Sequence, residues 1–250
     1  MSPDPEIPFT DKKFKVQAEF DRLADDYLRQ HKENVAVTGE SPEYFARYKI
    51  ADLASYLHGH DLSLGSVLDF GSGIGNSIPY FRKYFGQSRI TYADVSERSI
   101  EISKKRFPGM ESYVLIGQNL PIPSESQDVV FSACVFHHIP EEEHDYWLLE
   151  LMRVVKPGGV LAIYEHNPKN PLTVRAVNAC PLDINAELIE SRTLCRRAIN
   201  AGWEKPSVAY KLFFPAFFSY LRFLEKHLEW VSFGAQYRLI ARRPKYSVFD

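Results

Sequence analysis

The sequence lacks the features that mark disulfide-rich, metal-scaffolded and secreted chains. Its 250 residues contain 3 cysteines, an odd number, and no two of them have Cys-x-x-Cys spacing. This cysteine usage favours a reducing, intracellular compartment and argues against a structural zinc site. The first eight residues, MSPDPEIP, show no basic segment followed by an apolar one, so no secretory signal is predicted. We therefore expect a cytoplasmic protein that folds without disulfides or metal.

Long apolar runs and an excess of charge are also missing. The most apolar run, residues 212–221, contains a proline and is half as long as the roughly 20 residues that span a bilayer, so no membrane span is predicted. Thirty Lys and Arg side chains oppose 32 Asp and Glu, which leaves a formal net charge of −2. Charge gives no reason to expect a nucleic-acid partner.

The chain does have the composition of a globular protein, with 45% hydrophobic and 25% charged residues. Apolar segments typical of buried strands alternate with segments of helical period. This alternation predicts an α/β fold with a doubly wound, mostly parallel sheet. The predicted strands are 67–70, 89–94, 112–116, 128–132 and 160–165. The predicted helices between them are 76–85, 96–107 and 141–155. Ser96 is expected to cap the second helix, and Lys156-Pro157-Gly158-Gly159 to end the third.

Further elements flank this alternating region. The first 60 residues are mostly helical, and no linker separates them from the first strand, so we predict a helical N-terminal cap (1–60) on a main domain (61–250). Within the cap, residues 14–48 are expected to form a lid that orders when cofactor binds. After the fifth strand the pattern predicts a helix over 187–202, which ends at Gly202, and a strand over 207–213. A helix over 217–229 follows and forms a helical insertion near 215–230 in the main domain. The last predicted element is a strand over 236–243. The aromatic side chains of 213–223 are expected to pack in the core, and the alternative is that they line an acceptor pocket.

A glycine-rich turn follows the first predicted strand and opens a helix. It reads Gly71-Ser72-Gly73-Ile74-Gly75, and Asp94 ends the next strand 19 residues after Gly75. Glycines let a backbone approach a ligand closely, the helix start offers unpaired N–H groups, and a carboxylate at this distance binds a ribose diol. A dinucleotide fingerprint requires a third glycine at position 76, which is asparagine.

The spacing Asp69-x-Gly71-x-Gly73-x-Gly75 resembles motif I of the class I S-adenosylmethionine-dependent methyltransferases. The resemblance covers about residues 67–165 and continues in order through Asp94, Leu120-Pro121, Asp128-Val129-Val130, His137-His138 and the run 153–159. It is similar to the type 11/12-like members, and the tail at 165–173 looks like a bacterial subgroup often suspected in saccharide or surface-polymer pathways. The resemblance implies a Rossmann-like sheet of seven strands with the last one antiparallel, and S-adenosylmethionine as cofactor.

The resemblance also implies a cofactor site. The glycine loop would lie under the methionine part, Asp69 would order that loop, Asp94 would hold the ribose hydroxyls and Val95 would pack on adenine. The family often has an acidic residue after strand three that binds the adenine amine, and here Gln118 or the backbone would replace it. The full predicted cofactor set is Asp69, Gly71, Ser72, Gly73, Gly75, Asp94, Val95, Gln118, Asn119 and Ser132.

Catalytic candidates end strands four and five, at the edge where parallel sheets bind ligands. They are His137, Glu165 and His166. Histidine titrates near neutral pH, so His137 or the Glu165–His166 pair is predicted to take the proton of an acceptor hydroxyl on a saccharide-like or similar small molecule. Of the adjacent His137 and His138, one normally points into the protein. The ligand spacing matches no established metal set, so no metal is expected.

Two other function classes stay open at this point. One is a nicotinamide-dependent oxidoreductase, and the other is a catalytically silent cofactor-binding module. The sequence favours a methyltransferase with a small or medium-sized acceptor.

Overall fold

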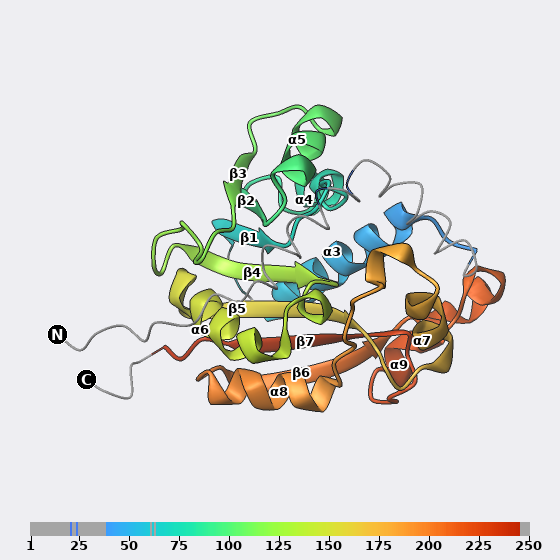
Figure 1. The fold of residues 1–250 in the computed structure, drawn as a ribbon. Coiled ribbons are helices and arrows are strands. Elements are labelled where there is room, and N and C mark those ends of the chain that lie inside the picture. The colour runs from blue at the N-terminus through green and yellow to red at the C-terminus, as the bar shows by residue number, and fades with distance from the viewer. Residues whose placement is uncertain (1–20, 22–23, 25–38, 61, 63, 246–250) are drawn as a thin grey trace.

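A seven-stranded sheet forms the centre of the protein, seen in a computed structural model that describes residues 21, 24, 39–60, 62 and 64–245. The strand order is β3-β2-β1-β4-β5-β7-β6 (Figure 1). Strands β1 to β5 are parallel, and β7 is antiparallel to both of its neighbours. This confirms the predicted doubly wound sheet with an antiparallel last strand. The strands are β1 Ser66–Phe70, β2 Arg89–Asp94, β3 Ser112–Leu115, β4 Gln127–Ala133, β5 Val155–His166, β6 Glu204–Lys211 and β7 Gln236–Arg242.

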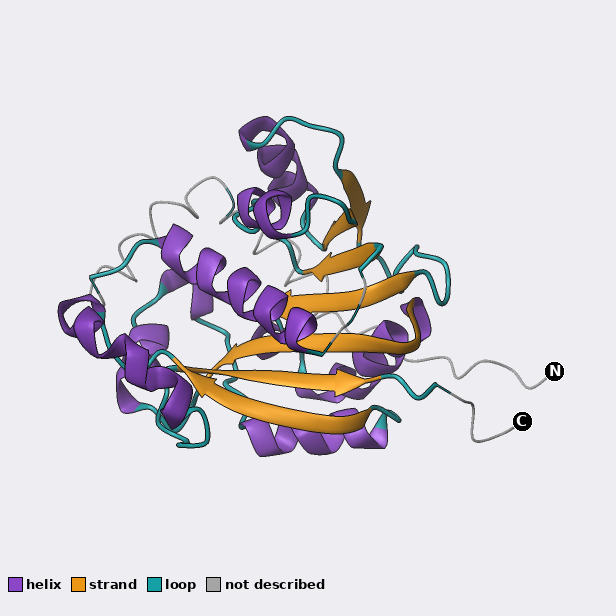
Figure 2. Cartoon of the chain, turned by 180° about the vertical axis from the view of Figure 1, so that it is seen from behind, coloured by secondary structure: helices purple, strands orange, loops and turns teal. Residues whose placement is uncertain are grey.

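Helices cover both faces of the sheet (Figures 1 and 2). Helices α3 and α4 pack on one face, and α6 and α8 pack on the other. The α-helices are α3 Pro42–Gly59, α4 Ile78–Tyr84, α5 Glu97–Arg106, α6 His144–Val154, α7 Pro171–Asn178, α8 Ser191–Asn200 and α9 Glu225–Leu228, and the 3₁₀ turns are η2 Phe136–His138, η3 Glu141–Glu143, η4 Pro181–Asp183 and η5 Ala216–Leu224.

Local sequence signals set several helix ends where they were predicted. The Ser96 hydroxyl accepts a hydrogen bond from the Ser99 amide at 2.9 Å and so caps α5. Beyond the C-terminus of α8, Gly202 adopts a φ of +91°, a left-handed conformation that glycine takes without strain. Both helix ends are therefore encoded by the residue type at one position.

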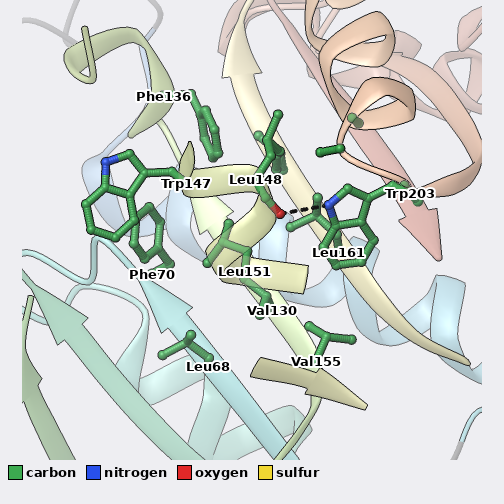
Figure 3. Packing of buried hydrophobic residues seen from close by; sticks show 14 of the residues in the cluster. Leu68, Phe70, Val130, Phe136, Trp147, Leu148, Leu151, Val155, Leu161 and Trp203 are labelled. Atoms are coloured by element: carbon green, nitrogen blue, oxygen red, sulfur yellow. Dashed lines mark hydrogen bonds between the residues drawn. The ribbon is translucent and has the colours of Figure 1, made fainter. Parts of the chain in front are cut away.

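The core between the sheet and α6 is built around large aromatic side chains (Figure 3). Trp147 of α6 lies against Phe70 of β1, with ring centroids 5.5 Å apart. Trp203 is 2% exposed, and its indole N–H donates to the Leu148 carbonyl at 3.0 Å. Because the buried indole N–H has its partner, the ring contributes its full apolar area to the core. This packing holds β1, β4 and α6 rigid behind the loops that follow β1 and β4.

Strand β5 begins earlier than predicted. Residues 156–159, expected as a turn that separates helix from strand, lie inside β5, which starts at Val155. Gly158 has a φ of +78°, and the register with β4 shifts between Gln127 and Val129. Gly158 and Gly159 are part of β5, which is irregular at this point in the manner of a β-bulge. Helix α6 is therefore followed directly by the strand.

Other boundaries also differ from the predictions. Helix α8 starts at Ser191 instead of 187, β6 covers Glu204–Lys211 instead of 207–213, and the helix expected over 217–229 is the 3₁₀ turn η5 followed by the short α9. Helix α7 was not predicted. The expectation that the 213–223 aromatics pack in the core is wrong for Phe217, Phe218, Tyr220 and Phe223, which are 40–71% exposed. Tertiary contacts decide such ends, which local propensity leaves open.

The N-terminal cap is described only in part. Helix α3 is described, and it packs on the sheet through Ile50, Leu53 and Leu57. Most of the predicted lid, residues 14–48, lies outside the described residues. Among the residues that are described, no helix has the length and apolarity to cross a membrane.

Candidate active site

The candidate site lies at the edge of the sheet where the parallel strands end. The Gly71 and Ser72 amides, just after β1, donate to the Ala93 carbonyl of β2 at 2.8 and 3.0 Å. The loop after β4 packs against the same turn: the Val135 side chain lies so close to Gly71 that a Cβ on this glycine would overlap it. The turns after β1 and β4 are thus packed together at one edge, as the topology of parallel sheets requires.

The three glycines of the loop have different roles. All have positive φ, +78° at Gly71, +52° at Gly73 and +82° at Gly75. A Cβ on Gly71 would overlap Val135, and one on Gly75 would lie 2.3 Å from Ser103 Oγ, whereas nothing lies within 4 Å of a Cβ on Gly73. The outer glycines therefore allow close packing, and Gly73 presents bare backbone to open space, where a ligand can approach it.

Two buried carboxylates flank this loop. Asp94 accepts hydrogen bonds from the Gly73 amide at 2.7 Å and the Ser96 amide at 2.9 Å, yet burial raises its pKa to about 6. Asp69 accepts from the Ser77 hydroxyl, and burial, reinforced by Asp94, raises its pKa to about 7. Two acids that ionise with difficulty side by side favour a ligand that brings positive charge.

The other predicted cofactor residues surround the loop. Val95 is half-buried, and Gln118 and Asn119 are exposed after β3. The hydroxyls of Ser72 and Ser132 are buried and have no hydrogen-bond partner among the described residues. Buried hydroxyls without partners are uncommon, and here they fit a polar ligand that approaches the ends of β1 and β4. An open glycine, two buried acids and these hydroxyls fit the polar, cationic methionine end of S-adenosylmethionine.

Glu165, at the end of β5, organises the turn that follows β4. One carboxylate oxygen accepts from the Val135 and Phe136 amides at 2.9 and 2.7 Å, and the other lies 2.5 Å from His137 Nδ1. Burial opposes the charge of Glu165, but His137 outweighs it and lowers the pKa of Glu165 to about 2. Glu165 is 1% exposed, so it is a fixed anion that holds η2 in place.

A second carboxylate reaches the same histidines from a distant segment. Asp183 Oδ1 lies 3.5 Å from His137 Nε2 and 3.4 Å from His138 Nε2. Burial disfavours a charged His137, but Glu165 and Asp183 outweigh it and raise the pKa of His137 to about 10. Burial and the neighbouring His137 lower the pKa of His138. Sequence reasoning missed Asp183, because no motif surrounds it and only the fold brings η4 to η2.

Cys134 was also missed, although a local sign marks it in the structure. It follows β4 directly and has a φ of +59°, unusual for a residue other than glycine and typical of functional turns. The buried Lys49 of α3 donates to its Sγ at 3.2 Å. Burial raises the pKa of this thiol, but Lys49 and His166 together overcome it and lower the pKa to about 6.

The structure brings the predicted residues together in two groups at one edge. Asp69, Asp94 and the glycine loop form the first group. His137 and Glu165 are in direct contact, and the ring of His166 lies 5.2 Å from that of His137. Of the two adjacent histidines, the His137 side chain is 1% exposed and that of His138 is 17% exposed, so His137 is the one that points fully into the protein. The roles of these residues in binding and catalysis remain predictions.

Comparisons with known proteins agree with this architecture. A family described as "Methyltransferase domain" matches residues 68–163. Phthiotriol/phenolphthiotriol dimycocerosates methyltransferase of Mycobacterium tuberculosis is 30% identical over 143 residues, which cover 56% of this chain and 50% of that protein. Fatty-acid O-methyltransferase of Mycolicibacterium smegmatis is 28% identical over 158 residues, 62% of this chain and 54% of that protein. The chain thus spans about half the length of the curated relatives it matches.

Solved structures share the fold at low sequence identity. A possible histamine N-methyltransferase of Thermotoga maritima has a TM-score of 0.62 at 21% identity, covering 92% of this chain and 100% of that one. Phosphoethanolamine N-methyltransferase 2 of Haemonchus contortus, in complex with S-adenosyl-L-methionine, has a TM-score of 0.63 at 17% identity, covering 92% of this chain and 60% of that one. At these identities the comparison supports the Rossmann-like fold.

Proposed function

We propose that this chain, which matches a methyltransferase domain over residues 68–163, belongs to the class I S-adenosylmethionine-dependent methyltransferase superfamily and transfers a methyl group from S-adenosylmethionine to a small or medium-sized acceptor. One observation carries the proposal: the bare backbone of Gly73 faces open space, its amide bonds to Asp94, and the buried Asp69 precedes the same loop. This arrangement suits a ligand with both a ribose and a positive charge. A nicotinamide dinucleotide supplies the ribose, but its pyrophosphate is poorly matched to two buried acids.

Each part of the site has a task in this proposal. Asp94 orders the loop through the Gly73 amide and has further lone pairs for the ribose hydroxyls. Asp69 offers its negative charge to the cationic end of the cofactor, and Gln118 and Asn119 edge the adenine. S-adenosylmethionine supplies an already electrophilic methyl group, because its sulfur is a sulfonium. The chain's own contribution is therefore mainly alignment of the acceptor, worth up to roughly 7–11 kcal/mol in favourable systems.

We infer that a hydroxyl is the acceptor and that His166 takes its proton. The oxygen bonds to the methyl carbon, the carbon–sulfur bond breaks, S-adenosylhomocysteine leaves and the proton goes to the imidazole. His137 is poorly suited as a base, because two carboxylates keep it protonated at neutral pH. Glu165 is engaged by two amides and His137. His166 is only half-buried beside them, which leaves it the most accessible of the three candidates.

The exposed aromatics favour an acceptor with a large apolar part. Phe217, Tyr220 and Phe223 of η5, together with Trp230, are 67–82% exposed. Helix α9, which follows η5 directly in the chain, and helix α7 lie at the end of the sheet toward which β4 and β5 point (Figure 1). The matched relatives are named for dimycocerosate and fatty-acid substrates. We therefore favour a hydroxylated lipid or glycolipid over a free saccharide, within the same methyl-transfer reaction.

Two measurements test the proposal. Titration calorimetry of the full chain with S-adenosylhomocysteine and with NADH is expected to show binding of the first only; the reverse would favour an oxidoreductase. Radiolabel transfer from S-adenosylmethionine is then measured on vesicles containing hydroxylated long-chain lipids and on free sugars. For His166→Gln we expect a rate loss of about 10²–10⁴-fold with unchanged S-adenosylhomocysteine affinity. Cofactor binding without transfer to any acceptor class would favour the silent binding module.

A further inference from the structure

We propose that His137, His138 and Asp183 form a binding site for a zinc ion, which nothing in the sequence pattern predicts. Each of the three side chains offers one ligand atom within 4.8 Å of the other two, and the Nε2 atoms of both histidines lie near Asp183 Oδ1. They come from two turns, η2 after β4 and η4 after α7, that the fold brings face to face. Two imidazoles and one carboxylate are donors that zinc accepts at catalytic sites, with the fourth position left open.

The tautomer of His137 gives the first argument. Its Nδ1 lies 2.5 Å from Glu165, which accepts and cannot donate as a carboxylate, so the Nδ1 proton is fixed there. A metal ion at Nε2 would replace the second proton that the two carboxylates otherwise keep on this ring. This nitrogen is buried, has no hydrogen-bond partner among the described residues, and faces the Asp183 carboxylate. A buried ring nitrogen that faces a carboxylate without a hydrogen bond leaves room for a bound cation between the two groups.

The distances distinguish a metal ion from a proton. A hydrogen bond from an imidazolium to a carboxylate is about 2.7–3.2 Å long, and the His137 Nε2–Asp183 Oδ1 separation is 3.5 Å. Two ligands on one tetrahedral zinc, each bonded at about 2.0–2.2 Å, lie roughly 3.3–3.5 Å apart. The separations of 3.5 and 3.4 Å from Asp183 to the two histidines match that geometry. Octahedral magnesium would place neighbouring ligands about 2.9 Å apart.

The surroundings supply the support that metal sites normally have. Glu165 orients His137 through the nitrogen opposite the proposed metal, and is itself held by the Val135 and Phe136 amides. A carboxylate behind a ligating histidine is a usual part of zinc sites. The Glu187 amide donates to the His137 carbonyl at 2.8 Å, which fixes the segment carrying Asp183 against η2. The Asp183 and Glu165 charges balance a dication with two neutral imidazoles.

The position suggests what the ion does. It would lie beside His166, at the carboxyl ends of β4 and β5, where the acceptor hydroxyl is placed in the proposed function. A zinc ion with an open position binds such a hydroxyl and lowers its pKa, which reduces the demand on the base. This role rests on the proposed function, whereas the binding site itself does not.

The test is direct metal binding to the untagged full chain after removal of metals with a chelator. Zinc affinity is measured by competition with a chromophoric chelator, and cobalt is used in parallel because a tetrahedral cobalt site has a strong visible spectrum. The variants are Asp183→Asn and His138→Gln for the ligands, Glu165→Gln for the positioning group, and His58→Gln as control, since His58 is an exposed histidine at the end of α3. S-adenosylhomocysteine binding is measured on the same samples.

We expect one zinc per wild-type chain, a loss of at least about 100-fold in affinity for either ligand variant, and about 10–100-fold for Glu165→Gln. The control should bind like wild type, and zinc should raise the melting temperature of wild type and control only. Absence of stoichiometric zinc binding, or wild-type affinity in Asp183→Asn and His138→Gln, overturns the site. Zinc binding without S-adenosylhomocysteine binding overturns the proposed function and leaves the metal site standing.

Discussion

The negative charge of the buried Asp69 is proposed to help bind the cofactor, but the same charge is expected to lower the stability of the fold. Burial raises its pKa from the ordinary 3.8 to about 7, so between about pH 4 and pH 7 the folded chain holds a proton that the unfolded chain has released. The unfolding free energy therefore falls as pH rises through this range. At about 1.4 kcal/mol for each tenfold change in an ionisation constant, the charged Asp69 costs roughly 4 kcal/mol above pH 7.

The substitution Asp69→Asn removes this charge and keeps an oxygen that accepts from Ser77. We expect the variant to gain stability relative to wild type as pH rises, by about 3 kcal/mol between pH 4.5 and pH 8. It should also bind S-adenosylhomocysteine more weakly. Urea unfolding at several pH values measures the difference, and Asp94→Asn is the matched comparison, whose gain should level off near pH 6 because the pKa of Asp94 is about 6. A stability difference that does not change with pH would refute the reasoning.

Three further predictions concern the same edge of the sheet. Asp94→Ala should weaken S-adenosylhomocysteine binding about 10–100-fold in calorimetry, because hydrogen bonds to a charged group contribute about 1.5–3 kcal/mol; unchanged affinity in a folded variant removes Asp94 from the site. Gly73→Ala should lower the unfolding free energy by only about 1–2 kcal/mol and abolish cofactor binding. Gly71→Ala should have a clearly lower melting temperature than Gly73→Ala, because its new methyl group overlaps Val135. Equal melting temperatures for the two variants would contradict this. Cys134 should react with iodoacetamide at pH 7 much faster than Cys180, because the pKa of Cys134 is lowered to about 6 and burial raises that of Cys180 to about 12. Peptide mass spectrometry measures both rates, and equal rates would argue against a thiolate at Cys134.

The parts of the fold that local sequence encodes were predicted well. Strand β2 is predicted to the residue, because a charged residue begins it and Asp94 ends it. The ends of α5 and α8 follow from Ser96 and Gly202, whose side chain or backbone freedom acts locally. The start of β5 at Val155 was not predictable in this way, since the register with β4 decides it. Boundaries set by contacts between strands leave no local signal.

The same distinction applies to the site. The glycine loop and Asp94 were predicted because their spacing along the chain is fixed by one strand–turn–helix unit. Glu165 and His137 were predicted as separate candidates, but their contact depends on the β4–β5 pairing. Asp183 and Lys49 were missed, since each comes from a segment without a motif and reaches the site only through packing. The sequence thus indicates the candidate residues that share one local spacing pattern, and leaves out those that only the packing of distant segments brings to the site.

The register of β4 and β5 explains why the second group of residues forms where it does. Ala133 pairs with Tyr164, so the next residue of β5, Glu165, lies beside the turn that follows β4. Its carboxylate then meets the Val135 and Phe136 amides and His137 without any long-range adjustment. Because Tyr164 is fully buried and β5 is paired on both sides, this carboxylate has little freedom to move. The turn that presents His137 to Asp183 is therefore as rigid as the core beneath it, which is what a preorganised catalytic or metal site requires.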